Sequence, residues 1–243
     1  MIYKINSRQK VGNAYIRILY PGAAMRDPSD TGLGPIGRID HANIPGNVTI
    51  EMHPHINDDI LSYFRKGHAQ HIDSEGISAT VSKKKLMLMK AGKIFHHEEH
   101  MPEPLEGLQI FIRPRIKDDV PEVLFRDLKG ETDSVDQWRL IASPNEDSTL
   151  QFSSQTWIYD TSISSGKVMD MPQYDKEKLT GLLYVFNGQV LVNEEIQLDK
   201  GESIVFHQED IQVKALEGSE LVLFLVDKES EYYDGGMYSG NKA

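Results

Sequence analysis

The sequence predicts an all-β protein built from two consecutive series of antiparallel strands. Short β-rich runs end at glycine, proline or asparagine, and no segment has convincing helical periodicity. The two series also resemble each other. Leu86 to His97 and Ile196 to His207 each read as a strand, a glycine turn and a β-rich return. Such a duplication favours two β-barrels or two β-sandwiches in one chain.

The first series begins with a β-rich run from Ala14 to Tyr20. Residues 22 to 47 then contain several glycines and three prolines with little periodicity, so we expect a long irregular loop there that wraps an edge or roofs a site. Leu61 to Phe64 and His68 to Ile72 flank Gly67, which predicts a hairpin.

A domain junction is predicted between Ile116 and Gln137, where the sequence is acidic, contains proline and is weakly periodic. We therefore expect an N-terminal metal-binding barrel over residues 1–130, a C-terminal barrel without metal over residues 137–230, and a tail over residues 231–243. The tail should lie over a barrel or be disordered.

Leu86 to Met89, apolar on both faces, should form a strand between two layers. Strands of the second series are expected at Gln155 to Tyr159, Gly181 to Phe186, Gln189 to Val192, Ser203 to Phe206 and Leu221 to Val226, with a hairpin turn at Asn187-Gly188.

Composition excludes several classes of function. The 243 residues carry a net charge of −11, which argues against general binding to a nucleic-acid backbone. The absence of cysteine excludes disulfides, thiolate metal sites and cysteine nucleophiles. No apolar run approaches the roughly 18 residues that span a bilayer, and the N-terminus has no signal-like apolar region. We expect a cytoplasmic protein with no membrane partner.

Histidines are concentrated in the first half, where six of the nine lie between His53 and His97. Side chains two residues apart on a strand share a face, so His53 and His55 should point the same way, as should His97 and Glu99. Three imidazoles and a carboxylate then converge on a site suited to a mid-row transition metal. The apolar residues before them, Val48, Ile50 and Met52, should face away from the two histidines.

The remaining histidines are expected to have other roles. His96 and Glu98 repeat the ligand spacing but should face the opposite, outer side of their strand. His68, His71 and His100 should support the ligands from behind, be hydrogen-bonded or face solvent, rather than bind the metal themselves. Gln109 either points inward to orient a bound water or satisfies backbone groups, and the pattern does not decide between these. His207 and Glu209 lack a partner His-x-His pair and should be an exposed strand end.

Several motifs together resemble the pirin branch of the cupins. They are His53-Pro54-His55, Ser62-Tyr63, Gly67, His71, Asp73-Ser74, Gly76, Ala91-Gly92, His97-x-Glu99, Gln109 and Pro114. Their order and spacing fit over about residues 10 to 115, and more loosely to about 230. Three positions depart from the family pattern: Asp59 stands where glutamate is usual, Ile94 where glycine is usual, and Phe111 where tryptophan is usual.

The resemblance implies a bicupin of two antiparallel barrels with a single metal in the N-terminal barrel, held by His53, His55, His97 and Glu99. Iron is the first expectation for one divalent ion per chain, with manganese, nickel, cobalt, copper and zinc as alternatives. Some members of the family oxidise flavonols such as quercetin, and others act as regulators through protein partners.

We therefore expect a metal-dependent dioxygenase of the quercetin 2,3-dioxygenase kind, acting on a flavonol or a related small aromatic substrate. Four protein ligands on a six-coordinate ion leave two positions for substrate oxygens or O2. Glu99 is the ligand that also has the chemistry of a general base for the substrate hydroxyl. Two alternatives stay open: a non-enzymatic regulator whose metal oxidation state controls its affinity for a protein partner, and a barrel whose metal is structural.

Overall fold

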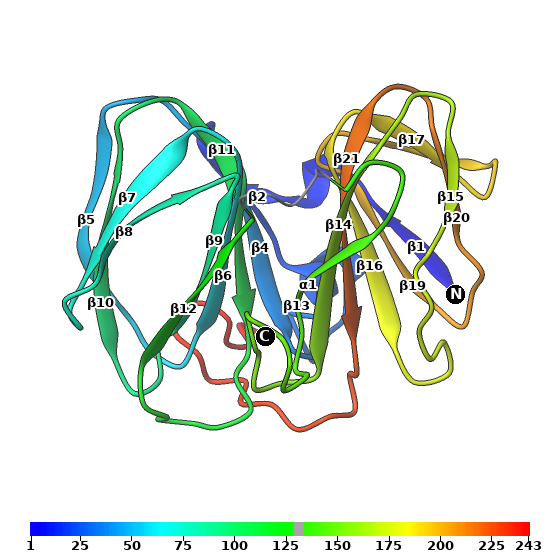
Figure 1. The fold of residues 1–243 in the computed structure, drawn as a ribbon. Helices are drawn as coiled ribbons and strands as arrows, with labels where there is room; N and C mark the ends of the chain where they lie inside the picture. The colour runs from blue at the N-terminus through cyan, green and yellow to red at the C-terminus, as the bar shows by residue number, and fades with distance from the viewer. Residues whose placement is uncertain (129–133) are drawn as a thin grey trace.

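The computed structural model describes residues 1–128 and 134–243, and almost all of its regular structure is β-strand. Figure 1 shows two curled halves side by side, each wound from antiparallel strands. The described helices are a 3-10 turn, η1 (Ser7–Gln9), and one short α-helix, α1 (Pro21–Met25). The predicted all-β class is confirmed. Residues 129–133, within the predicted junction, lie outside the described residues.

The N-terminal half is a single curled sheet of eleven strands. Along the sheet the order is β2-β3-β4-β11-β6-β9-β8-β7-β10-β5, with β12 also paired to β9. The strands are β2 (Val11–Gly12), β3 (Ile16–Leu19), β4 (Ile36–Ile44), β5 (Val48–His55), β6 (Asp59–Lys66), β7 (His68–Asp73), β8 (Ser78–Ser82), β9 (Lys85–Lys90), β10 (Phe95–Met101), β11 (Leu105–Ile112) and β12 (Glu122–Asp127).

The C-terminal half has a six-stranded sheet in the order β1-β19-β16-β21-β14-β13 and a four-stranded sheet in the order β15-β20-β17-β18. Apolar side chains such as Leu183, Val190, Phe206 and Val213 form one buried cluster that fills this half. The strands are β1 (Ile2–Ile5), β13 (Arg139–Ala142), β14 (Thr156–Ile163), β15 (Val168–Asp170), β16 (Thr180–Asn187), β17 (Gln189–Val192), β18 (Ile196–Asp199), β19 (Ser203–His207), β20 (Gln212–Ala215) and β21 (Ser219–Val226).

Each terminus of the chain packs on the half that is distant from it in sequence. The N-terminal strand β1 pairs with β19, so it completes the six-stranded sheet of the C-terminal half. The tail after β21 runs back to the N-terminal half, as the red trace in Figure 1 shows. One buried cluster also joins the halves, since Leu61 and Leu88 belong to the same core as Leu182 and Phe224. The predicted domain boundaries stay a prediction, and the halves share packing.

The irregular loop expected over residues 22 to 47 was wrong, because that segment contains β4, a central strand paired with β3 and β11. Both faces of β4 are buried, and its polar residues Arg38 and Asp40 form an ion pair with each other at 2.8 Å. Because these charged residues lie on a buried face, β4 lacks the alternation of apolar and polar residues that marks a half-exposed strand. The segment predicted as the junction likewise contains β12.

The two predicted hairpins were also wrong, although their turns and strands exist. β6 pairs with β9 and β11, whereas β7, just after Gly67, pairs with β8 and β10. In the same way β16 and β17 flank Gly188 but lie in different sheets. Gly67 and Gly188 have φ of +70° and +86°, which glycine adopts at little cost. A local turn signal therefore identified the bends but not the partners, which long-range packing selects.

The expected phase of β5 was wrong for Val48 and Ile50, which pack against a buried cluster, whereas Met52 is exposed as expected. His53 lies opposite His97, but Ile50 lies opposite Glu99, so the register shifts between these two pairs. This irregularity in the ladder changes which side chains share a face. Ile50 consequently packs inward, beside a cavity that Glu99 also lines, instead of facing away from the histidines.

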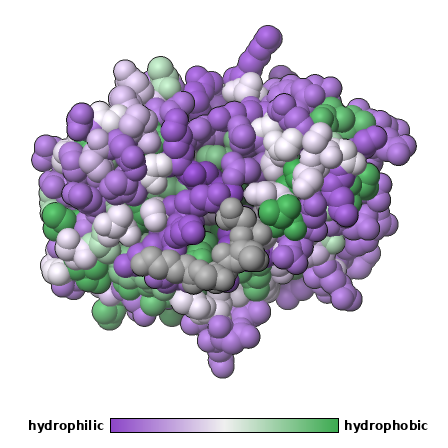
Figure 2. Space-filling view, turned by 45° about the horizontal axis from the view of Figure 1, so that its top comes forward, coloured by the Kyte–Doolittle hydropathy of each residue, from purple (hydrophilic) through white to green (hydrophobic). Residues whose placement is uncertain are grey.

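The outer surface is polar on the face seen in Figure 2, where apolar side chains form small separate patches. This agrees with a chain in which acidic residues outnumber basic ones, 37 to 26. Among the residues that the structure describes, no helix combines the length and the apolar character that crossing a bilayer requires.

Candidate metal centre

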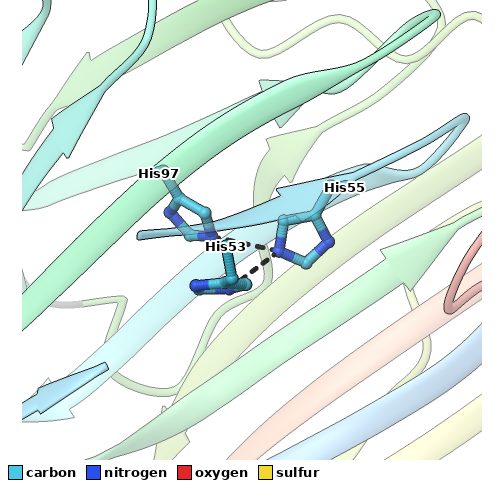
Figure 3. Close-up of side chains that lie close together, drawn as sticks. All are labelled: His53, His55 and His97. Atoms are coloured by element: carbon cyan, nitrogen blue, oxygen red, sulfur yellow. Dashed lines mark hydrogen bonds between the residues drawn. The ribbon is translucent and has the colours of Figure 1, made fainter. Parts of the chain in front are cut away.

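Three of the four predicted ligands converge in the N-terminal half. His53 and His55 lie on β5 and His97 on the neighbouring strand β10, and Figure 3 shows their rings turned toward one another. His55 Nε2 lies 3.2 Å from His53 Nε2 and 3.0 Å from His97 Nε2. His55 and His97 are buried, whereas His53 is half-buried. The side of the cluster nearest solvent is therefore the side of His53.

The contacts of His53 and His55 favour tautomers in which their Nε2 lone pairs face each other. His53 Nδ1 donates to the carbonyl of Glu51 at 2.8 Å, so the Nε2 atom of the neutral ring carries no proton. His55 Nδ1 lies 3.6 Å from Asp58 Oδ2, which favours the same tautomer for His55. Lone pairs about 3 Å apart repel unless a cation or proton lies between them. Two nitrogens that each bind one ion at about 2.1 Å and at a right angle lie about 3.0 Å apart, so the spacing fits a shared metal ion.

Burial favours the neutral, metal-binding form of His55 and His97. Burial, followed by the charges of His55, His53 and His71, lowers the pKa of His97 to about 2. Burial also lowers the pKa of His55, against the opposing effect of Asp58. Since a metal competes with protons for the same lone pairs, a site that disfavours protonation favours the ion.

Glu99, the fourth predicted ligand, lies in a second group that overlaps the first. Potential ligand atoms of His71, His97 and Glu99 lie within 4.8 Å of one another, and so do those of His53, His55 and His97. His97 is common to both groups. Glu99 Oε2 accepts a hydrogen bond of 2.8 Å from Gln109, whereas its buried Oε1 has no hydrogen-bond partner within the described part of the chain. Burial raises the pKa of Glu99 to about 7.

Gln109 thus points inward, and the alternative that it satisfies backbone groups is not the one observed. His71 does not face solvent but lies against His97. It is fully buried, its Nδ1 lies 3.3 Å from His97 Nδ1, and its Nε2 lies 2.9 Å from Asp73 Oδ2. The buried Asp73 and His71 therefore support the far side of the His97 ring. Because His71 and Asp73 lie two residues apart on β7, the sequence indicated their common face but not their contact with His97.

The tail supplies contacts that no local pattern indicated. The backbone N–H groups of Tyr238 and Ser239 donate to Asp58, and Ser239 N lies 2.7 Å from Oδ1. The Tyr238 ring lies 5.1 Å from the His55 ring, measured between centroids. Residues some 180 positions away thus hold the carboxylate and the ring beside a predicted ligand.

The remaining histidines take peripheral positions. His68 pairs with Glu103, His100 contacts Thr49, and His96 is half-buried on the other face of β10. His207 ends β19 in the C-terminal half, and Glu209 pairs with the N-terminal amine of Met1. Ile94 is exposed and has no positive φ, because Gly92 provides the left-handed residue of that turn, at φ +50°. The ligand set of His53, His55, His97 and Glu99 stays a prediction.

Replacing Asp58 with asparagine should weaken metal binding by about 10- to 100-fold, the usual cost of losing a group that orients a ligand. The amide keeps the size of the side chain but removes the negative charge beside His55 Nδ1. Its NH2 group also replaces one carboxylate oxygen, and an NH2 group does not accept the hydrogen bonds of the backbone N–H groups. Competition with a chelator would measure the dissociation constant. Asp118→Asn, at an exposed position that contacts Asn57, is the matched control and should leave the constant unchanged.

Comparison with known proteins supports the assignment of both halves. The model of the pirin family matches residues 27–112, and the model of the quercetinase C-terminal cupin domain matches residues 140–226. A candidate quercetin 2,3-dioxygenase of Pasteurella multocida is 27% identical over 183 residues, which cover 72% of this chain and 75% of that protein. The quercetin 2,3-dioxygenase of Escherichia coli K12 is 25% identical over 202 residues, covering 82% and 85%.

The fold is also that of solved relatives. The structure of YhhW from Escherichia coli matches with a TM-score of 0.78 and 23% identity, covering 93% of this chain and 97% of that one. A second YhhW structure, a bacterial pirin in complex with nickel(II), matches with a TM-score of 0.76 and 21% identity, covering 93% and 99%. The predicted bicupin fold is therefore confirmed. With one family model on each half and this fold, the chain belongs to the pirin family of cupin proteins.

Proposed function

We propose that this protein binds one divalent transition-metal ion through His53, His55, His97 and Glu99 and acts as a dioxygenase on a flavonol or a related small aromatic compound. The observation that carries the proposal is the convergence of three imidazole Nε2 atoms, with distances of 3.0 and 3.2 Å, next to a buried carboxylate. Relatives named quercetin 2,3-dioxygenases support the substrate class. Iron remains the first expectation for the ion, and the nickel complex of YhhW supports nickel as an alternative.

A bound ion of this kind supplies Lewis acidity to substrate oxygens and, when redox-active, a path for electrons to O2. The protein side chains then supply position and proton transfer. His71 and Asp58 hold the rings of His97 and His55. Gln109 fixes one oxygen of Glu99, which leaves Oε1 as the acceptor for the proton of a substrate hydroxyl.

The space beside Glu99 restricts how a substrate reaches the site. An apolar cavity of about 20 Å³ lies there, lined by Ile50, Phe64, Met101 and Leu105 together with Glu99 and Gln109. This volume accommodates about one water-sized molecule, so a flavonol does not fit inside the barrel without movement of side chains. We infer that the aromatic substrate approaches from the half-buried side of His53 and presents only its chelating oxygens to the ligands.

Glu99→Gln should lower turnover about 100-fold or more while leaving most of the metal bound, because an amide oxygen still binds an ion but does not accept the proton. The measurement is oxygen uptake by the iron, manganese, nickel, cobalt and copper forms with a panel of flavonols and catechols, together with metal analysis of each sample. Glu98→Gln, the neighbouring carboxylate on the other face of β10, should keep normal turnover.

The small size of the cavity also favours a second candidate, a metal-dependent regulator that acts through a protein partner. The same oxygen-uptake experiment separates the two candidates. If fully metallated protein consumes no oxygen with any flavonol or catechol in any metal form, the dioxygenase proposal is wrong and the regulator becomes the better reading.

A further inference from the structure

A second cluster of titratable side chains lies between the two halves, remote from the histidine cluster in its contacts. Lys10 follows η1, His41 lies on β4, Glu106 on β11 and Tyr184 on β16. Lys10 Nζ donates to the Tyr184 hydroxyl, which lies 2.8 Å from His41 Nδ1. His41 Nε2 lies 3.2 Å from Glu106 Oε1. An amine, a phenol, an imidazole and a carboxylate thus form one continuous hydrogen-bonded chain.

Lys10 is an unusual lysine because it is buried without a counter-ion. It is 6% exposed, and within the described part of the chain it forms no ion pair. Burial first, and then the charge of Arg17, lower the pKa of Lys10 to about 7, while Glu202 acts in the opposite direction. A neutral amine on a desolvated lysine is a nucleophile that an ordinary surface lysine, with a pKa near 10.4, is not at neutral pH.

The other groups of the chain have fixed protonation states. The hydrogen bond that Glu106 accepts from His41, together with Lys200 at 2.6 Å, lowers the pKa of Glu106 to about 2. Glu106 is therefore a carboxylate. Burial lowers the pKa of His41 and raises that of Tyr184, so the imidazole is neutral and the phenol keeps its proton. Tyr184 is therefore a neutral phenol held between the amine and the imidazole, where its hydroxyl can relay a proton.

The amine faces a pocket of about 210 Å³ that opens to solvent. Exposed Tyr15 and Asn43 form part of its mouth, and the charged side chains of Arg17 and Lys200 belong to its lining. Gly201 lies next to the amine, where a Cβ atom would come within 3.3 Å of Lys10 Nζ. The absence of a side chain there keeps the approach to the nitrogen open. Glu106 also lines the pocket and pairs with Lys200 at 2.6 Å, so Arg17 is the cation that favours a ligand with negative charge.

We propose that Lys10 is a nucleophilic amine that forms an imine with a small carbonyl compound carrying a carboxylate, of the 2-oxo acid class. The nitrogen attacks the carbonyl carbon, a C–N bond forms, and the carbonyl oxygen takes a proton from Tyr184. The nitrogen then loses a proton back to Tyr184, which gives a neutral carbinolamine and restores the phenol. Tyr184 next protonates the new hydroxyl, the C–O bond breaks as water leaves, and the nitrogen lone pair forms the C=N bond. The proton on the resulting iminium returns to Tyr184. The products are an imine and water, with no oxidant or reductant required.

The roles of the neighbours follow from the contacts. Tyr184 transfers the protons, His41 accepts the hydrogen bond that orients the phenol, and Glu106 fixes the tautomer of His41. Arg17 provides positive charge for the carboxylate of the ligand, whereas the charge of Lys200 is balanced by Glu106. None of these residues belongs to the proposed metal site, so the proposal stands or falls independently of the dioxygenase function.

Reductive trapping tests the proposal on the intact protein. Glyoxylate with sodium cyanoborohydride at pH 7 converts an imine into a stable carboxymethyl-lysine, which peptide mapping by mass spectrometry locates. Lys10 should be labelled at least about tenfold faster than the exposed Lys84 and Lys167, because about half of its amine is neutral near pH 7. Equal or slower labelling of Lys10 than of these two lysines would overturn the proposal.

The pH profile and the variants separate the parts of the proposal. A group with a pKa of about 7 loses its neutral form as the pH falls through 7, so labelling of Lys10 should level off above about pH 8, while that of surface lysines keeps rising. A profile that rises to pH 10 contradicts the amine assignment. Lys10→Arg should lose the fast label and keep the fold. Tyr184→Phe should slow it several-fold, and unchanged labelling would remove Tyr184 from the reaction.

Glycolaldehyde, a neutral aldehyde of similar size, tests the ligand class. It should label Lys10 several-fold more slowly than glyoxylate does, because it lacks the carboxylate that Arg17 attracts. Equal rates for the two aldehydes would contradict the assignment to 2-oxo acids.

Discussion

His97→Ala should reduce the bound metal from about one ion per chain to nearly none. His97 is the one residue common to both groups of potential ligands, and its nitrogens contact His55 on one side and His71 on the other. Removing it therefore leaves fewer donors and a cavity in a buried site. Metal analysis after reconstitution and dialysis measures the change, and His53→Ala should have the same result.

Two histidines outside the cluster are matched controls for this experiment. His96→Ala alters the neighbouring residue on the other face of β10, and His207→Ala alters the C-terminal half. Both variants should retain the full metal content. Full retention by His97→Ala, or metal loss by either control, would show that the ligands lie elsewhere.

Arg113→Ala should lower the free energy of unfolding by about 3–5 kcal/mol, the usual cost of removing one partner of a buried ion pair. The Arg113 side chain is 1% exposed and forms a bidentate pair with Asp30, at 2.6 and 2.7 Å. It also donates to the carbonyl of Gly34 and to that of Ser239 in the tail, each at 2.9 Å. Alanine removes this donor from both carbonyls and the cation from Asp30, which keeps the hydrogen bond from the Gly32 N–H. Denaturant unfolding measures the loss.

The same substitution should loosen the metal site, because Arg113 anchors Ser239 in the tail. The backbone N–H groups of Ser239 and its neighbour Tyr238 hold Asp58. Limited proteolysis should cleave the tail near Ser239 faster in Arg113→Ala than in the unsubstituted protein, and metal affinity should fall. Arg115→Ala, two residues later at an exposed position, should change stability by less than about 0.5 kcal/mol. If the tail of Arg113→Ala stays protected, its anchoring role is wrong.

Much of the fold was predictable because local patterns reflect burial directly. Leu86 to Met89 is apolar on both faces, and β9 is indeed buried on both, between β6 and β12 in the sheet. The spacing of His53 with His55, and of His97 with Glu99, likewise predicted side chains on common faces, since a strand repeats every two residues. The pairing of β5 with β10, which brings the two sets together, was expected only from the convergence of their chemistry and from the family resemblance.

What depends on long-range packing was not readable from the sequence. Gly67 and Gly188 marked bends, but the strands that follow cross to other partners. The register shift in β5 turned Ile50 inward. The strand β4 was predicted as a loop, because its charged residues Arg38 and Asp40 are buried as an ion pair and hide the pattern of a strand.

The sequence by itself determined the all-β class, the family and the histidine-rich strands, because these depend on residues close together in the chain. Only the tertiary structure decided that Tyr238 and Ser239 support Asp58 beside His55, and that Lys10 meets Tyr184 across 174 residues. No local pattern encodes such contacts, because each arises from the burial of many side chains at once. That burial closes both halves and packs the N-terminal strand on the C-terminal half and the C-terminal tail on the N-terminal half.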